Sequence, residues 1–264
     1  MSRGLAPDTE PQREPLESEL LELHRTLYTS RNPTRRWLHE TRRDWITDAL
    51  RRVSPQSRHR ALEVGFGSGI YLSILAELFD EVVATDVEEI FLRNAGALTA
   101  RWPNLKVVAD DITCTKLPTA SFDLVLCSEV IEHLHDSASA MAGIHSLLHP
   151  GGTLVLSTPQ RWSILEMLAK VAFLPGIIAV VRRVYNEPVR NTQHINLMTA
   201  DQVTRQLERA GFHILERDTS GMYLPLVAEF GGPQGMRLER WLESALRDGP
   251  LRRLLWTQYY IARA

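Results

Sequence analysis

Three glycines follow a short apolar strand, and this turn constrains the fold more than any other feature of the sequence. Gly65, Gly67 and Gly69 stand between a predicted strand at 60–64 and the helix that follows it. A glycine-rich turn from strand to helix lets a ligand approach the backbone closely. The dinucleotide fingerprint would need its third glycine five residues after the first, where this chain has Ile70. The turn therefore predicts a cofactor site that is not of the dinucleotide type.

Apolar stretches alternate with helical patterns along the chain. Strands that are apolar throughout are typical of a parallel sheet covered on both faces. The predicted fold class is therefore α/β, with a Rossmann-like, mostly parallel sheet and helices on both faces in one domain at 54–264. Two helices over 16–53 and a disordered tail at 1–15 precede this domain. The predicted strands are 60–64, 81–85, 106–109, 122–127, 152–157, 213–218 and 254–261, and the predicted helices are 70–78, 89–100, 200–210 and 237–246.

Composition narrows the class of protein. The chain has 264 residues, 44% of them hydrophobic, which suits one sizeable core. A net charge of −2 argues against a protein that holds nucleic acid by bulk positive charge. Its two cysteines, Cys114 and Cys127, lie in or beside apolar runs, so we expect two buried thiols and a reducing compartment. Residues 1–15 contain no apolar signal segment, and we therefore expect a cytoplasmic protein.

An acidic residue ends the second predicted strand. Asp86 comes 21 residues after Gly65, close to the spacing at which a carboxylate reaches the ribose hydroxyls of a cofactor bound at such a turn. We therefore expect Asp86 to be the best single cofactor contact. The alternative role for such a residue is to cap a helix or to lie in an ordinary loop.

These features together resemble the class I S-adenosylmethionine-dependent methyltransferases. The resemblance rests on Leu62 to Gly69, on Asp86, on the pair Asp110-Asp111 and on residues 121–126, and it covers about residues 55 to 264. It implies a seven-stranded sheet in the order 3-2-1-4-5-7-6, whose last strand runs antiparallel. It also implies that the cofactor is S-adenosylmethionine.

The same resemblance assigns roles to residues near the turn. Glu63 and Gly65 would border the methionine part of the cofactor. Asp110 would accept a hydrogen bond from the adenine amino group, and the backbone of Asp111 or Ile112 would meet a ring nitrogen. For the two aspartates the alternative is a solvated turn after a strand. The predicted cofactor contacts are thus Glu63, Gly65, Gly67, Gly69, Asp86, Asp110, Asp111, Ile112 and Ser128.

Acidic and imidazole side chains follow the fourth predicted strand. If a helix begins there, Glu129, Glu132 and His133 lie at i, i+3 and i+4 and project from one face. Two carboxylates and an imidazole supply most of a divalent-metal site. His194 is the predicted fourth ligand, because it follows the fifth strand at the end of the sheet where the loops converge.

This ligand pattern resembles two metal-dependent branches of the superfamily. One is the ubiquinone-pathway O-methyltransferases, and the other methylates the terminal 2′-hydroxyl of small RNAs. Magnesium is the ion that the resemblance implies, although mixed oxygen and nitrogen ligands suit manganese, iron or zinc at least as well. In the metal-free alternative, His133 would be the general base, and Glu129 and Glu132 would cap and position the helix. The predicted catalytic residues are His133 and Glu129.

An apolar segment at 161–193 separates the fifth strand from His194. Within it, residues 162–183 are too apolar for an ordinary surface loop, but Glu166, Lys170 and a Pro-Gly break argue against a transmembrane helix. We expect two short helices here. They would form a lid over a hydrophobic substrate, rest on an anionic membrane surface, or pack on the sheet or a second subunit. The oligomeric state is left open.

A basic stretch at 31–60 contains nine arginines. An RNA-binding face is one interpretation, but such charge more often lies on the solvated side of amphipathic helices, here with Trp37, Trp45 and Ile46 inward. The sequence shows no RNA-binding signature beside it. The expected activity is therefore O-methylation of a small or lipid-like hydroxylated substrate, with metal assistance. The alternatives are an RNA 2′-O-methyltransferase and a metal-free N- or C-methyltransferase of a small natural product.

Overall fold

The computed structural model describes Tyr28 and residues 33–53, 59–172, 194–224 and 227–264. The predicted tail, the first of the two predicted N-terminal helices, and the second helix of the apolar segment fall outside these residues. The other predicted N-terminal helix is α2 (Pro33–Val53), and the first helix of the apolar segment is α7 (Ile164–Ala172).

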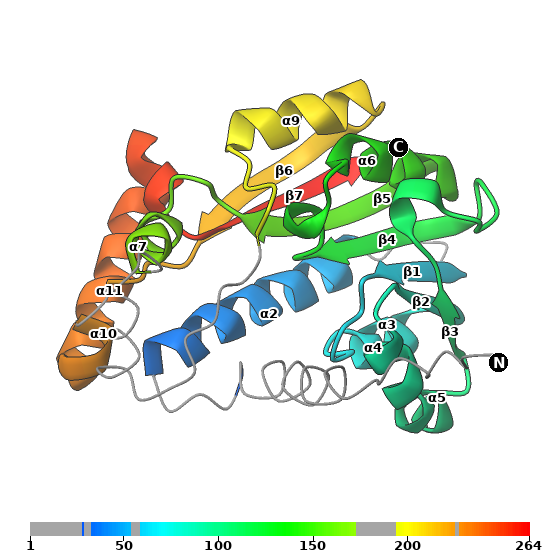
Figure 1. Cartoon of the computed structure of the whole chain (residues 1–264), viewed down its shortest axis with the longest axis horizontal. Helices are drawn as coiled ribbons and strands as arrows, with labels where there is room; N and C mark the ends of the chain where they lie inside the picture. Colours follow the sequence, from blue (N-terminus) through cyan, green and yellow to red (C-terminus); the bar gives the residue numbers. More distant parts are fainter. Residues whose placement is uncertain (1–27, 29–32, 54–58, 173–193, 225–226) are drawn as a thin grey trace, which may run out of the picture.

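A seven-stranded sheet forms the centre of the molecule, in the order β3-β2-β1-β4-β5-β7-β6 (Figure 1). The strands from β3 to β5 pair in parallel, whereas β7 pairs antiparallel with both β5 and β6. The predicted strand order and the antiparallel last strand are both confirmed. The strands are β1 (Arg60–Val64), β2 (Glu81–Asp86), β3 (Leu105–Ala109), β4 (Phe122–Ser128), β5 (Leu148–Pro159), β6 (His213–Ser220) and β7 (Thr257–Arg263).

Helices cover both faces of the sheet, as the apolar strands predicted. The helices α2 and α3 (Leu72–Leu78) pack on one face, and α6 (Ser137–Leu147) and α9 (Ala200–Arg209) pack on the other (Figure 1). The remaining helices are α4 (Glu89–Asn94), α5 (Gly96–Arg101), α10 (Val227–Phe230) and α11 (Gly232–Arg247), with 3-10 turns at η1 (Ile112–Cys114), η2 (Ile131–His133) and η3 (Pro250–Leu254).

The helix predicted at 89–100 is divided in two. α4 ends before Ala95 and α5 begins at Gly96. Asn94 and Gly96 are both weak helix formers, and the backbone entropy of glycine disfavours a continuous helix at this point.

The core has two layers, one on each face of the sheet. Along β4, Val125 and Cys127 join one layer, and Leu124 and Leu126 join the other. Successive side chains of a strand point to opposite faces, so a strand that is apolar throughout feeds both layers. The continuous apolar pattern of the sequence is therefore explained by burial on two sides.

The two cysteines differ in exposure, which corrects the expectation that both are buried. Cys127 is buried in β4, whereas Cys114 is exposed at the end of η1. The short 3-10 turn directs Ile112 inward and leaves Cys114 outside. Burial raises the pKa of the Cys127 thiol far above its ordinary value.

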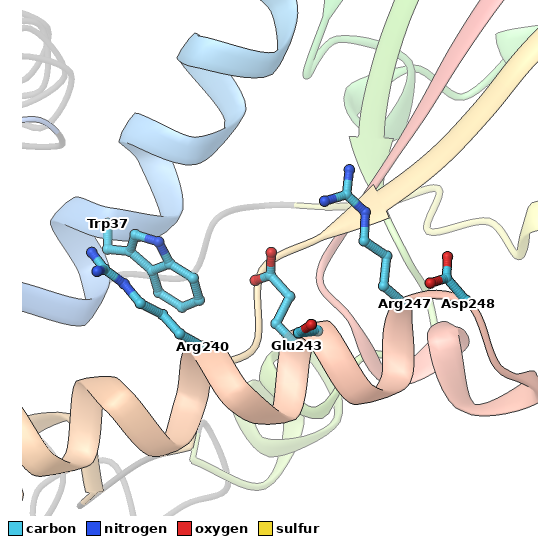
Figure 2. A pocket seen from close by; sticks show the side chains of 6 residues that line it. Trp37, Arg240, Glu243, Arg247 and Asp248 are labelled. Carbon is cyan, nitrogen blue, oxygen red and sulfur yellow. The ribbon is translucent and has the colours of Figure 1, made fainter.

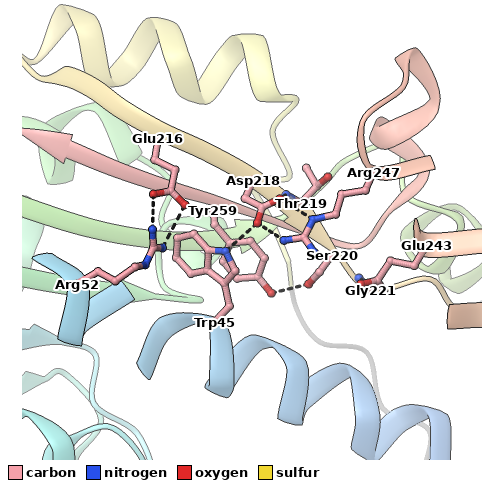
Figure 3. Close-up of polar contacts among 10 residues, drawn as sticks. All are labelled: Trp45, Arg52, Glu216, Asp218, Thr219, Ser220, Gly221, Glu243, Arg247 and Tyr259. Atoms are coloured by element: carbon pink, nitrogen blue, oxygen red, sulfur yellow. Dashed lines mark hydrogen bonds and ion pairs between the residues drawn. The ribbon is translucent and has the colours of Figure 1, made fainter. Parts of the chain in front are cut away.

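Aromatic and charged contacts attach α2 to the β6–β7 edge of the sheet (Figure 3). Trp45 stacks on Tyr259 of β7, with ring centroids 4.3 Å apart, and its indole donates a hydrogen bond to Asp218 of β6 at 2.8 Å. Asp218 also accepts a hydrogen bond from Arg247 of α11, so three elements meet at one carboxylate. Ile46, beside Trp45 in the sequence, is buried as predicted.

Candidate active site

The glycine turn after β1 has the backbone conformation that its sequence predicted. Gly65, Gly67 and Gly69 have φ values of 65°, 50° and 71°, in the left-handed region that favours glycine. The amide of Gly65 donates a hydrogen bond to the carbonyl of Thr85 at 2.7 Å, which fixes the turn against the end of β2. A Cβ atom on Gly65 would lie 2.6 Å from a methyl group of Val130, so glycine is required there on two grounds.

Asp86 is buried at the end of β2 and binds this turn directly. One carboxylate oxygen accepts a hydrogen bond from the amide of Gly67 at 3.0 Å, and the other accepts from the amide of Glu88 at 2.9 Å. Each oxygen keeps a second lone pair for a ligand. The structure thus brings Asp86 to the glycine turn, where the sequence expected it. Its contact with a ribose stays a prediction.

Glu63 precedes the turn in β1 and is almost completely buried. Its Oε2 atom has no hydrogen-bond partner among the described residues. Burial, and next the negative charge of Asp86, raise the pKa of this carboxyl well above its ordinary value. A buried carboxyl with an unused oxygen beside a ligand-binding turn fits the predicted place of Glu63 next to the cofactor.

The residues predicted to surround the adenine lie together after β3. Asp110 accepts a hydrogen bond from the amide of Lys116 at 2.9 Å, and Asp111 caps η1 by accepting from the amide of Thr113. Ile112 is buried. The two carboxylates therefore stabilise the local turn, which was the alternative for them. Their predicted adenine contacts remain untested.

The segment after β4 differs from its prediction. No α-helix begins at Glu129 in this described stretch: Glu129 has a positive φ of 56°, η2 follows as a single 3-10 turn, and α6 begins only at Ser137. Asp136 supplies the N-cap of α6 by accepting from the amide of Ser139. Glu129, Glu132 and His133 therefore do not share one helical face.

Glu129 is bound by an arginine of α2, and this contact separates it from the other predicted ligands. Its Oε2 lies 2.5 Å from Arg42 Nη1, and its Oε1 accepts a hydrogen bond from Ser157 at 3.0 Å. Ser157 Oγ also lies 2.9 Å from Ser128 Oγ. Burial acts to lower the pKa of Arg42, but the Glu129 carboxylate keeps it raised. Arg42 is thus buried, in contrast to the solvated face expected for the arginines of 31–60.

Glu132, His133 and His194 lie together, although His194 is distant in sequence. One ligand atom of each residue lies within 4.8 Å of those of the other two. The amides of Ile195 and Asn196 donate to the carbonyl of Glu132 at 3.0 and 2.9 Å, which holds the segment of His194 against η2. The structure therefore brings together three of the four predicted metal ligands and excludes Glu129 from the group.

Glu132 is the buried member of this group. Its Oε2 accepts a hydrogen bond from Thr158 at 3.0 Å, whereas its Oε1 is buried with no partner among the described residues. Burial, and then the charge of Glu129, raise the pKa of Glu132 well above its ordinary value. A buried carboxylate with one unused oxygen, next to two imidazoles, is a suitable set of donors for a transition-metal cation.

The pattern of a methyltransferase domain matches residues 37–217 of this chain, which is more than half of its length. The chain belongs to this methyltransferase family. The predicted resemblance to class I S-adenosylmethionine-dependent methyltransferases is confirmed by the family match together with the sheet order.

Relatives of the methyltransferase agree with this assignment. A probable S-adenosylmethionine-dependent methyltransferase of Mycolicibacterium smegmatis is 29% identical over 194 residues, which are 72% of this chain and 65% of that protein. The chain thus spans slightly less than two thirds of the length of that relative. The mitochondrial ubiquinone biosynthesis O-methyltransferase of Schizosaccharomyces pombe is 27% identical over 194 residues, 72% of this chain and 67% of that protein.

Among solved structures, the N-methyltransferase NodS of Bradyrhizobium japonicum, in complex with S-adenosyl-L-homocysteine, has the same fold. The TM-score is 0.56 at 19% identity, with 94% of this chain and 96% of that chain covered. At this identity the likeness shows the fold alone.

Two residues that contact the predicted site residues were missed from the sequence. Arg42 lies four residues before Ile46, on the buried side of α2, and this helical spacing was an available signal. Glu166 is buried in α7 and contacts His194. The sequence used Glu166 only as an argument against a transmembrane helix, and nothing in its spacing pointed to His194.

One cavity among the described residues is not lined by any of the predicted site residues. It has a volume of about 460 Å³ and lies between Trp37 of α2 and the α11 side chains Arg240, Glu243, Arg247 and Asp248 (Figure 2). The carboxylate of Glu243 accepts hydrogen bonds from two backbone amides, which gives this residue a structural role. The predicted site residues lie elsewhere, at and after the carboxyl ends of β1, β2, β3 and β4.

In the described part of the chain, none of the helices combines the length and the apolar character needed to cross a membrane. The helix α7 nevertheless exposes several apolar side chains. Met167, Leu168 and Val171 are 37%, 40% and 50% exposed, and Trp162 just before the helix is 49% exposed.

Proposed function

We propose that this methyltransferase binds S-adenosylmethionine and transfers its methyl group to a hydroxyl of a small or lipid-like molecule, assisted by a divalent cation. The observation that carries the proposal is the cluster of Glu132, His133 and His194 at the carboxyl end of β4, with ligand atoms within 4.8 Å of one another. A site made of two imidazoles and one carboxylate leaves coordination positions for two adjacent hydroxyls of an acceptor.

The residues near the glycine turn fit the cofactor. The left-handed glycines Gly65, Gly67 and Gly69 leave the turn without side chains that could keep a ligand from its backbone, and Asp86 keeps lone pairs for ribose hydroxyls. The unused oxygen of Glu63 lies in the strand just before the turn. When bound, the cofactor supplies an electrophilic methyl group on its sulfonium.

The residues of the cluster fit a cation softer than magnesium. Imidazole nitrogen favours manganese, iron or zinc, and the displacement of Glu129 toward Arg42 leaves one carboxylate where the sequence predicted two. A cation held by Glu132, His133 and His194 would lower the pKa of an acceptor hydroxyl and orient it.

Methyl transfer to a hydroxyl is a single substitution step. The acceptor oxygen forms a bond to the methyl carbon, the carbon–sulfur bond breaks with its electron pair going to sulfur, and the hydroxyl proton leaves to a base. His133, which is exposed at the end of η2, is the residue we assign to accept this proton if no cation is bound. Glu129 would then act through its position and not as a ligand.

A hydroxylated, lipid-like acceptor is supported by two observations. The helix α7 contacts His194 of the cluster through Glu166, and it exposes several apolar side chains. Ubiquinone biosynthesis O-methyltransferases of Schizosaccharomyces pombe and Aeromonas salmonicida are 27% and 28% identical to this chain. These observations favour such an acceptor over RNA and over a nitrogen or carbon acceptor. We also propose that 162–183 makes a peripheral membrane contact, of which only the part through Ala172 is described.

Two assays test the proposed function. Calorimetry should detect binding of S-adenosylhomocysteine but not of NAD. Transfer of labelled methyl groups should then be screened over catechols, quinols, sugars and short RNA, before and after exhaustive chelation. The variant His194→Ala should lose transfer, while the matched variant His135→Ala, at an exposed histidine outside the cluster, should retain it.

The outcomes separate the parts of this proposal. Full activity after chelation, with His194→Ala active and His133→Ala inactive, would replace the cation by a general base. Exclusive labelling of RNA, or of a nitrogen or carbon atom, would overturn the acceptor class. Co-sedimentation with anionic vesicles checks the membrane contact, and equal binding by a Val171→Asp variant would argue against it.

A further inference from the structure

We propose that Glu166 is a positioning residue for His194: the carboxylate of α7 fixes the tautomer of the imidazole and thereby couples the apolar segment to the active site. This inference rests on the proposed function in one respect only, namely that His194 takes part in methyl transfer. It concerns a residue of the segment that was expected to form a lid, a membrane contact or a packing element.

Glu166 is an acidic residue buried within an apolar helix, which requires an explanation. It is 6% exposed and lies in the first turn of α7, where its amide donates a hydrogen bond to Ser163 Oγ at 3.2 Å. A charged side chain is rarely buried unless it is paired or hydrogen-bonded. The partners of its carboxylate therefore indicate what Glu166 does.

Both identified side-chain partners meet the same oxygen of Glu166. The indole of Trp256 donates a hydrogen bond to Oε1 at 3.1 Å, and Nδ1 of His194 lies 3.1 Å from that oxygen. The imidazole is turned so that this second contact has the distance but not the angle of a hydrogen bond. Both side chains are at least nine-tenths buried, so water competes little for the contact.

The consequence follows from the chemistry of imidazole. A neutral ring carries one proton, and a carboxylate next to Nδ1 favours the tautomer with the proton on Nδ1. The lone pair then resides on Nε2, the nitrogen left for a cation or for a substrate proton. A carboxylate that binds the outer nitrogen of a ligand histidine in this way also raises its basicity.

The indole of Trp256 completes the arrangement. Trp256 comes just before β7, and its carbonyl accepts a hydrogen bond from the amide of Gln160 at 2.6 Å. It therefore anchors the Glu166 carboxylate to the sheet, whereas His194 is anchored to η2 through the neighbouring amides of Ile195 and Asn196. The orientation of the His194 ring therefore depends on where α7 packs.

The test measures the tautomer directly in the cofactor-free protein. Long-range ¹⁵N–¹H correlation spectra at about pH 8, above the ordinary pKa of imidazole near 6.5, distinguish a proton on Nδ1 from one on Nε2. A His194→Gln variant assigns the signal. We expect Nδ1–H in the wild type and in Glu166→Gln, whose amide carbonyl can still accept, and a shift toward Nε2–H in Glu166→Ala. Lys170→Ala, exposed on the same helix, is the matched control and should leave the spectrum unchanged.

A second readout is the affinity for Mn²⁺, measured by calorimetry on the same variants. Glu166→Ala should weaken it by about 10- to 100-fold, and Glu166→Gln by much less, if the carboxylate orients a ligand. An Nε2–H or doubly protonated ring in the wild type, or one tautomer common to all variants, would overturn the proposal. Should Mn²⁺ not bind the wild type at all, the metal part of the proposed function fails, while the tautomer still decides the role of Glu166. The wild-type spectrum alone is decisive if Glu166→Ala does not fold.

Discussion

The buried pair of Arg42 and Glu129 offers the sharpest test of how α2 supports the site. Arg42 is 6% exposed and its guanidinium lies 2.5 Å from the Glu129 carboxylate. The substitutions Arg42→Met and Glu129→Gln each remove one charge; glutamine keeps the shape of glutamate, and methionine replaces arginine by a shorter unbranched apolar chain. Each variant leaves the other charge buried without its counter-charge.

The expected magnitude follows from this burial. Removal of one member of a buried ion pair costs about 3 to 5 kcal/mol, because the remaining charge is desolvated and unpaired. The Glu129 side chain is 18% exposed, so water relieves part of that cost, and we expect about 3 kcal/mol for each single variant. The double variant leaves no unpaired charge. It should cost about 2 to 3 kcal/mol less than the sum of the singles.

Urea unfolding followed by circular dichroism measures the four free energies of unfolding. The double-mutant cycle is needed because Arg42 also contacts His39 and lies 5.3 Å from the ring of Trp256, and the cycle cancels those contacts. Additive costs, within about 0.5 kcal/mol, would refute the assignment of an ion pair that holds Glu129 away from Glu132.

Four further predictions concern the cofactor end, the glycine turn, the thiols and the attachment of α2. Asp86→Ala should weaken S-adenosylhomocysteine binding by about 1 to 3 kcal/mol in calorimetry, since charge-assisted bonds to the ribose are lost. Gly69→Ala should lower the free energy of unfolding by at least about 1 to 2 kcal/mol, because residue 69 has a left-handed φ. A thiol reagent should modify Cys114 in the folded protein and Cys127 only after unfolding. Burial acts to raise the pKa of Asp218, but hydrogen bonds from Arg247, Thr219 and Trp45 outweigh it, so the pKa lies below its ordinary value of 3.8. The stability lost in Asp218→Asn at pH 7 should therefore shrink as the pH falls below that value. A loss that does not depend on pH in thermal scans would contradict this prediction.

The sequence was sufficient for the fold and for the conformation of the glycine turn, while the contacts of these residues with the cofactor stay predictions. Local spacing decides these features: an apolar run defines β1, the left-handed turn requires glycine at Gly65, and Asp86 ends the next strand. Parallel strands with short connections permit few arrangements, and a family resemblance supplied the strand order that the structure has. No knowledge of distant contacts was needed for any of these predictions.

The sequence alone could not decide the chemical end of the site. The helical spacing of Glu129, Glu132 and His133 suggested one face, but Glu129 has a positive φ and η2 is a single 3-10 turn, and only Glu132 and His133 remain together. The pairing of Glu129 with Arg42 joins residues 87 positions apart, and Glu132 meets His194 only through tertiary contacts. Such contacts depend on where α2 and the segment before α9 pack.

What the sequence by itself determined is therefore the scaffold: a class I methyltransferase sheet with a glycine turn and an acid at the end of β2. What only the tertiary structure decided is which charges meet. Arg42 is buried because α2 packs on the sheet beside β7, and Glu166 is buried because α7 packs against Trp256. The physical reason is the distance along the sequence over which each feature is determined. Backbone conformation and hydrophobic periodicity depend on residues a few positions apart, whereas the partner of a buried charge depends on how whole helices and strands pack.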